Sequence, residues 1–166
     1  MRDGALRRVA DLIDRLGLWG GYVAAVATFG ILALVTLEML LRGVFGYSTQ
    51  ISDEMSGYLN VALVYFGLAM ALRDGSYVRV EPVFNHFTGW AALAVRWFIV
   101  LVSLVFMWVT TRVMLNYLAY SYEAGLRATS YSESPLWIPQ SFIVLGSVLL
   151  MLQLVAFLLR GGRTVP

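Results

Sequence analysis

Four long apolar runs follow one another along the chain, and charged or turn-forming residues separate them. The hydrocarbon core of a bilayer is about 30 Å thick and takes roughly 20 residues of α-helix, so each run can cross it. The pattern predicts transmembrane helices at residues 17–41, 54–72, 90–117 and 138–159. In the third span only 15 uncharged residues separate Arg96 from Arg112, so both side chains must extend toward the headgroups. The expected fold is an all-α membrane protein with four transmembrane helices.

Residues 1–16 have a different pattern, in which apolar positions recur at helical spacing among charged ones. Leu6, Val9, Ile13 and Leu16 follow one another every three or four residues, and arginine and aspartate occupy the remaining faces. This is typical of an amphipathic helix that lies in the headgroup region, the alternative being a solvated tail. The predicted organisation is this interfacial helix, a four-span membrane domain over 17–160 and a short tail over 161–166.

Composition and charge narrow the class of protein. Hydrophobic residues fill 60% of the 166 positions and charged residues only 13%, which excludes a soluble globular domain. A net charge of +2 on so apolar a chain gives no indication of nucleic-acid binding. The lack of Cys removes disulfides and thiolate metal sites, and a single His excludes a bis-His haem within the chain. Since no hydrolytic or phosphate-binding motif is present either, we predict no catalytic, metal or cofactor site.

The distribution of arginine predicts the orientation in the membrane. All twelve cations are Arg, and an even number of spans places both termini on one side. Nine arginines lie in the N-terminal segment, around the loop 73–90 and at the C-terminus, against three in the other loops. Positive residues favour the cytoplasmic side. We therefore expect both termini, the interfacial helix and the 73–90 loop to be cytoplasmic.

Charged residues around the first connection between spans form the candidate site. Glu38 is the only acid within an otherwise apolar run, close to the predicted end of the first span. It indicates either an interfacial or subunit-contact role or, as in small four-span exporters, a proton site. Arg42 and Glu54 flank the following loop and either form an ion pair, between spans or to a partner, or serve only anchoring and capping. In the second case Ser52 is the expected N-cap of the second span.

Small and amide residues mark faces on which helices can approach closely. Gly17 and Gly21 lie on one side of the first span, and Asn60 and Gly67 lie in the second. We expect Asn60, and Gln153 in the fourth span, to face other helices, because an unpaired amide in hydrocarbon is costly. Two interpretations of these faces are packing within the chain and contact with another subunit.

Several short motifs keep the order and spacing of one transporter family. An Arg follows the first span at Arg42, an acid opens the second at Glu54, Gly67 lies within it, and Arg73 begins the turn that ends it. Together with residues 51–59, 77–81 and 136–139, this resembles the DctQ-like small membrane subunit of tripartite ATP-independent periplasmic (TRAP) transporters, over about residues 15–160. The residues for which we expect a structural or subunit-interface role are Gly17, Gly21, Glu38, Arg42, Glu54, Asn60, Gly67 and Arg73.

The resemblance implies a non-enzymatic role in the bacterial inner membrane. In such systems a periplasmic binding protein captures the solute, often an organic acid, and a large DctM-like subunit moves it inward with sodium. The small subunit binds the large one and acts as a static scaffold. The implied partners are the large subunit, the binding protein and lipids, and the sodium is held by the large subunit. The alternative function is an autonomous four-span exporter that uses Glu38 as its proton site.

Overall fold

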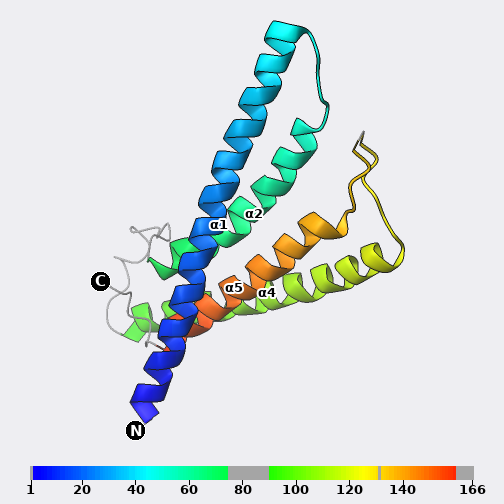
Figure 1. The fold of residues 1–166 in the computed structure, drawn as a ribbon. Coiled ribbons are helices and arrows are strands. Elements are labelled where there is room, and N and C mark those ends of the chain that lie inside the picture. Colours follow the sequence, from blue (N-terminus) through cyan, green and yellow to red (C-terminus); the bar gives the residue numbers. More distant parts are fainter. Residues whose placement is uncertain (1, 75–89, 131, 160–166) are drawn as a thin grey trace.

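The computed structural model describes residues 2–74, 90–130 and 132–159, and this part of the chain is built from four long helices. They are α1 (Arg2–Phe45), α2 (Ser52–Arg73), α4 (Trp90–Glu123) and α5 (Trp137–Leu159) (Figure 1). Each helix is long and apolar enough to cross a membrane, so the predicted all-α class with four spans is confirmed. Most of the predicted 73–90 loop and the 161–166 tail lie outside the described residues.

Helix α5 holds the bundle together. Figure 1 shows two antiparallel pairs, α1 with α2 and α4 with α5, which lie close together near the start of α1 and separate toward the opposite end. α5 packs against α1, α2 and α4, and it is the most buried of the four helices. We call the end that carries the connecting segments 46–51 and 124–136 the loop end, and the opposite end the terminal end.

Two glycines determine where helices stop at the loop end. Gly46 has φ +66° and follows the last residue of α1, and the N–H of Tyr47 donates to the carbonyl of Leu41 at 3.3 Å. Gly125, with φ +61°, ends α4 in the same way. This left-handed conformation suits glycine and closes a helix by satisfying its last carbonyl groups. α4 therefore runs to Glu123, past the predicted boundary at residue 117.

Helix α1 continues without a break through residue 16, where the predicted interfacial helix meets the first span. Its 44 residues correspond to a length of about 66 Å, well beyond the hydrocarbon core. Ala10 and Ile13 are buried against Ala156 of α5, whereas Val9 and Leu16 of the predicted apolar stripe are exposed. Among the stripe residues whose side chains the structure describes, Ile13 alone belongs to the face that joins this part of α1 to the bundle.

Helices α4 and α5 enclose an apolar cluster with a polar pair beside it. Val100 and Met107 of α4 are buried with Leu150 and Leu154 of α5. The Thr111 hydroxyl lies 3.0 Å from that of Ser147, and it also donates to the carbonyl of Met107 in its own helix at 2.7 Å. Since hydroxyl groups bonded within their own helix carry little desolvation cost, they can be buried between spans.

Glycine allows an amide to cross from α5 to α1 at the terminal end. Gln153 is buried, and its Nε2 donates to the carbonyl of Ile13 at 2.8 Å. A Cβ on Gly17 would overlap this same amide nitrogen. The expectation that Gln153 faces another helix is therefore correct, and the absence of a side chain at Gly17 makes the contact sterically feasible.

The glycine faces of α1 and α2 are turned toward each other. A Cβ on Gly21 would overlap the side chain of Met70, and one on Gly67 would lie 3.7 Å from the Cβ of Ala24. Of the two interpretations of these positions, the structure shows packing within the chain. Small residues here let the α1 and α2 backbones approach closely, as is typical of helix pairs in lipid.

A glycine contact against the backbone of a neighbouring helix predicts a specific loss of stability. A Cβ on Gly146 of α5 would lie 2.5 Å from the Cβ of Tyr65 and 3.1 Å from its carbonyl carbon, so the backbone of α2 obstructs it. Gly146→Ala should push α2 and α5 apart and destabilise the chain by about 1–3 kcal/mol. The measurement is the thermal unfolding midpoint of the purified chain in detergent.

Gly57→Ala is the matched control, because no atom lies within 4 Å of a Cβ at this exposed position of α2. Alanine is the better helix former by about 0.5–1 kcal/mol, so this variant should be as stable as the parent or more so. Equal losses in the two variants would contradict the assigned α2–α5 contact.

Candidate functional site

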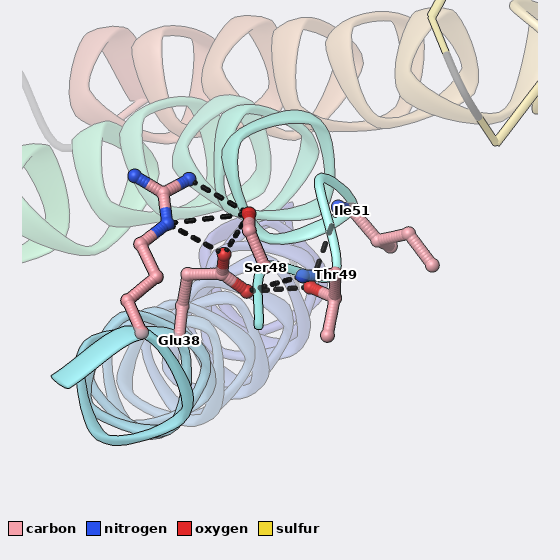
Figure 2. Close-up of polar contacts among 5 residues, drawn as sticks. Glu38, Ser48, Thr49 and Ile51 are labelled. Atoms are coloured by element: carbon pink, nitrogen blue, oxygen red, sulfur yellow. Dashed lines mark hydrogen bonds and ion pairs between the residues drawn. The ribbon is translucent and has the colours of Figure 1, made fainter. Parts of the chain in front are cut away.

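The loop end carries two carboxylates, and the first belongs to Glu38 near the end of α1. Glu38 is buried, with 7% of its surface exposed. One oxygen accepts from the Ser48 hydroxyl at 2.6 Å and from Nε of Arg42 at 3.0 Å. The other accepts from the hydroxyl and the backbone N–H of Thr49, at 2.5 Å and 3.3 Å (Figure 2). The carboxylate thereby binds the 46–51 segment back onto α1.

Arg42 balances the charge of Glu38 from one turn further along the same helix. Its guanidinium also donates to the Ser48 hydroxyl, at 3.2 Å from Nε and 3.0 Å from Nη2. The proposed Arg42–Glu54 ion pair is therefore wrong: Arg42 pairs with Glu38. The i,i+4 spacing brings these two side chains together within one helix, whereas Glu54 lies across a loop and has other partners.

The second carboxylate, on Glu54 in the first turn of α2, is surrounded by hydroxyl groups. One oxygen accepts from Ser130 and Ser132, and the other accepts from Ser134 and from Tyr58, the last at 2.5 Å. The Tyr58 and Ser134 hydroxyls are themselves 2.8 Å apart. Three of these groups lie in the 124–136 segment, so Glu54 joins the start of α2 to the connection between α4 and α5.

The 124–136 segment forms a short hairpin, which sequence reasoning missed. Arg127 and Pro135 form an antiparallel bridge, the N–H of Ala128 donates to the carbonyl of Ser134 at 2.9 Å, and that of Leu136 to Leu126 at 3.1 Å. Serine at every second position, 130, 132 and 134, was the available signal. These serines lie around the turn of the hairpin, where the N–H of Glu133 donates to the carbonyl of Ser130 at 3.2 Å, and serine is a residue that turns favour.

Ser52 does not cap α2, contrary to expectation. Ile51 occupies the N-cap position without a side-chain hydrogen bond, and Ser52 is the buried first residue of the helix. The N–H of Ile51 instead approaches the Thr49 hydroxyl at 3.5 Å. Because Thr49 is bound to Glu38, the loop ends early enough for α2 to begin at Ser52. This is one residue earlier than if Ser52 were the N-cap.

The remaining predicted residues lie away from these clusters. Arg73 is at the terminal end, where it pairs with Asp74 at 3.1 Å and its Cδ lies 3.3 Å from where a Cβ of Gly17 would be. Asn60 is exposed on α2, on the same side as Gly57 and Val64. The expectation that Asn60 faces another helix is therefore not met within this chain.

Both carboxylates at the loop end act as acceptors for the protein's own donors. Every oxygen of Glu38 and Glu54 accepts from two groups, which come from Arg42 or from nearby hydroxyls and backbone. Hydrogen bonds to an ionised acceptor are about twice as strong as neutral ones. The arrangement joins loops to helices, and in the described residues no group of three or more His, Cys, Asp or Glu is placed to hold a metal.

Four apolar helices, joined at one end by carboxylate–hydroxyl clusters, define a multi-pass α-helical membrane protein. The family model of the DctQ component of tripartite ATP-independent periplasmic transporters matches residues 31–164. The chain belongs to this family, whose members are components of transporters. No curated protein and no solved structure matches it.

The Glu54 cluster predicts an energetic coupling between α2 and the hairpin. Glu54→Ala and Ser132→Ala each remove the same hydrogen bond, so their effects on the free energy of unfolding should not add, with a coupling of about 1 kcal/mol. The control cycle combines Glu54→Ala with Arg42→Gln, which should be additive within about 0.5 kcal/mol. Coupling in the control cycle, or additivity in the first, would show that Glu54 has other partners.

Proposed function

We propose that this chain is the small permease subunit of a TRAP transporter, which binds the large DctM-like membrane subunit and serves as its static scaffold. The complex would import an organic acid or a similar solute with sodium, after delivery by a periplasmic binding protein. The observation that carries the proposal is the family match over residues 31–164, which includes parts of all four helices. Sodium and solute are assigned to the large subunit.

The exposed face of α2 supports docking onto another membrane subunit. Asn60 lies in the interior of α2, and Gly57 and Val64, one turn to either side, are exposed with it. An amide without a partner in hydrocarbon is costly, and small neighbours let a second helix approach. We infer that a helix of the large subunit packs here and supplies a hydrogen-bonding group to Asn60.

The geometry of Glu38 favours a scaffold over the alternative exporter. A proton site needs a carboxylate that can gain and lose its proton while it exchanges with a substrate pathway. The Glu38 carboxylate instead accepts from Arg42, Ser48 and Thr49 at the end of α1. These bonds hold the 46–51 segment, so we assign Glu38 to the architecture of the loop end.

We further propose that the loop end faces the periplasm and that both termini are cytoplasmic in the bacterial inner membrane, because arginine is concentrated at the terminal end. The chain has no Cys, which makes single-cysteine labelling unambiguous. Thr129→Cys, at an exposed hairpin position, should react with a membrane-impermeant maleimide in intact spheroplasts, and Ser76→Cys only after permeabilisation. Labelling of Ser76→Cys in intact spheroplasts would reverse the orientation.

The docking proposal predicts that Asn60→Leu weakens association with the large subunit. Co-purification from cells that express both subunits should fall, while the unfolding midpoint of the isolated chain stays the same, because Asn60 is exposed and its side chain has no hydrogen bond to the described residues. Asn116→Leu is the matched control, since this amide is also exposed but lies on α4. Equal effects of the two variants would place the interface elsewhere.

Proteoliposomes test the scaffold role itself. A labelled organic acid should enter only when this chain, the large subunit and the binding protein are all present. Saturable, ion-coupled transport by the purified chain alone would overturn the scaffold function and return Glu38 as the candidate proton site.

A further inference from the structure

Arg112 is a charged residue on a part of α4 that the rest of the bundle leaves open. The preceding residue, Thr111, is buried against Ser147 of α5. Successive residues of an α-helix are turned by about 100°, so Arg112 points away from that contact, and it is exposed. Within the described ranges it forms no ion pair and no side-chain hydrogen bond. Its positive charge is therefore available to a group outside the chain.

Trp108, one turn earlier in α4, holds this guanidinium in place. The Cζ of Arg112 lies 5.8 Å from the centroid of the Trp108 ring, and the indole is itself half exposed. A cation–π contact restricts the guanidinium without using its N–H groups as donors. The result is a positioned cation with free donors on an exposed surface of α4.

The spacing of charges along α4 determines the depth of this group in a membrane. Arg96 and Arg112 bracket the uncharged part of the helix, and 16 residues at 1.5 Å each separate them by about 24 Å. The hydrocarbon core is about 30 Å thick, and arginine side chains extend outward to cover the difference. Arg112 therefore lies at the level of the lipid phosphates on the loop-end side. Tyr117 and Tyr120, which follow it, suit the headgroup layer.

From this position we propose that Arg112, held by Trp108, is a binding site for the phosphate group of an anionic phospholipid in the leaflet at the loop end. A guanidinium donates two parallel hydrogen bonds to phosphate oxygens, and its charge complements that of the lipid. A carboxylate on a partner helix would need to lie at the same headgroup depth, where lipid phosphates are abundant. The lipid is thus the favoured occupant, and the site does not depend on the partner subunit.

Fluorescence of Trp108 tests this proposal directly. Trp19, Trp90, Trp97 and Trp137 are replaced by Phe, and the full-length chain is reconstituted in phosphatidylcholine vesicles. A minor fraction of the lipid carries bromine on its acyl chains, near the headgroup end. This brominated lipid is phosphatidylglycerol in one preparation and phosphatidylcholine in the other. Brominated phosphatidylglycerol should quench Trp108 fluorescence at about fivefold lower content than brominated phosphatidylcholine does. This is the factor expected for one cation at an anionic lipid surface. Arg112→Gln should abolish this preference, and Arg112→Lys should retain part of it.

Arg127→Gln is the matched control, because Arg127 is an exposed arginine in the hairpin rather than on the lipid-facing surface of α4. It should leave the preference unchanged. Equal quenching by the two lipids, or a preference that survives Arg112→Gln, would overturn the proposal. Loss of co-purification with the large subunit in Arg112→Gln, together with equal quenching, would assign Arg112 to a partner carboxylate instead.

A second measurement covers the case in which the single-tryptophan variant does not fold. Native mass spectrometry of the unmodified chain, released from detergent with added phosphatidylglycerol, should show more retained lipid than Arg112→Gln prepared in the same way. Equal retention by the two chains would also overturn the proposal.

Discussion

Helices in a bilayer gain no hydrophobic free energy from meeting one another, because lipid tails are as apolar as the side chains they would replace. Association must instead come from close packing and from polar groups that find partners. In this chain both requirements meet where Gly17 leaves room for the Gln153 amide to reach the carbonyl of Ile13. Gly146 serves the same purpose against Tyr65. These contacts join α5 to α1 and α2, and its apolar cluster with α4 completes its central position in the bundle.

At the loop end, hydrogen bonds to charged side chains rather than close packing join the segments to one another. Glu38 binds the 46–51 segment to α1, and Glu54 binds the 124–136 hairpin to α2. The two antiparallel pairs separate toward this end (Figure 1). The hydroxyls of Ser130, Ser132 and Ser134 bind Glu54 at the start of α2 and so connect the two pairs. Charge-assisted hydrogen bonds suit this position, because few apolar contacts are available there. The outcome is a bundle that is connected at both ends.

A bundle connected in this way suits the role of a fixed support within a larger transporter. The carboxylates of Glu38 and Glu54 and the amide of Gln153 serve contacts within the chain. Among the polar residues exposed on the described helices, two carry our proposals about its neighbours. Asn60 presents an amide on α2, and Arg112 presents a cation on α4. We assign the first to a partner helix and the second to a lipid phosphate. On this view the two surfaces of the subunit face different neighbours, and α5 lies between the helices that carry them.

Sequence alone determined the number and the order of the spans, because each depends on a continuous apolar run that any local window reveals. It also determined the family, through Arg42, Glu54, Gly67 and Arg73 in their order along the chain. The partners of each polar group were decided only by the tertiary structure. Arg42 pairs with Glu38 rather than Glu54, and Glu54 with serines some 76–80 positions away, because these choices depend on which segments meet in space. Asn60 and Gln153 are both amides in apolar spans, yet only Gln153 faces a helix of its own chain, since the rotation of each helix is set by packing against its neighbours.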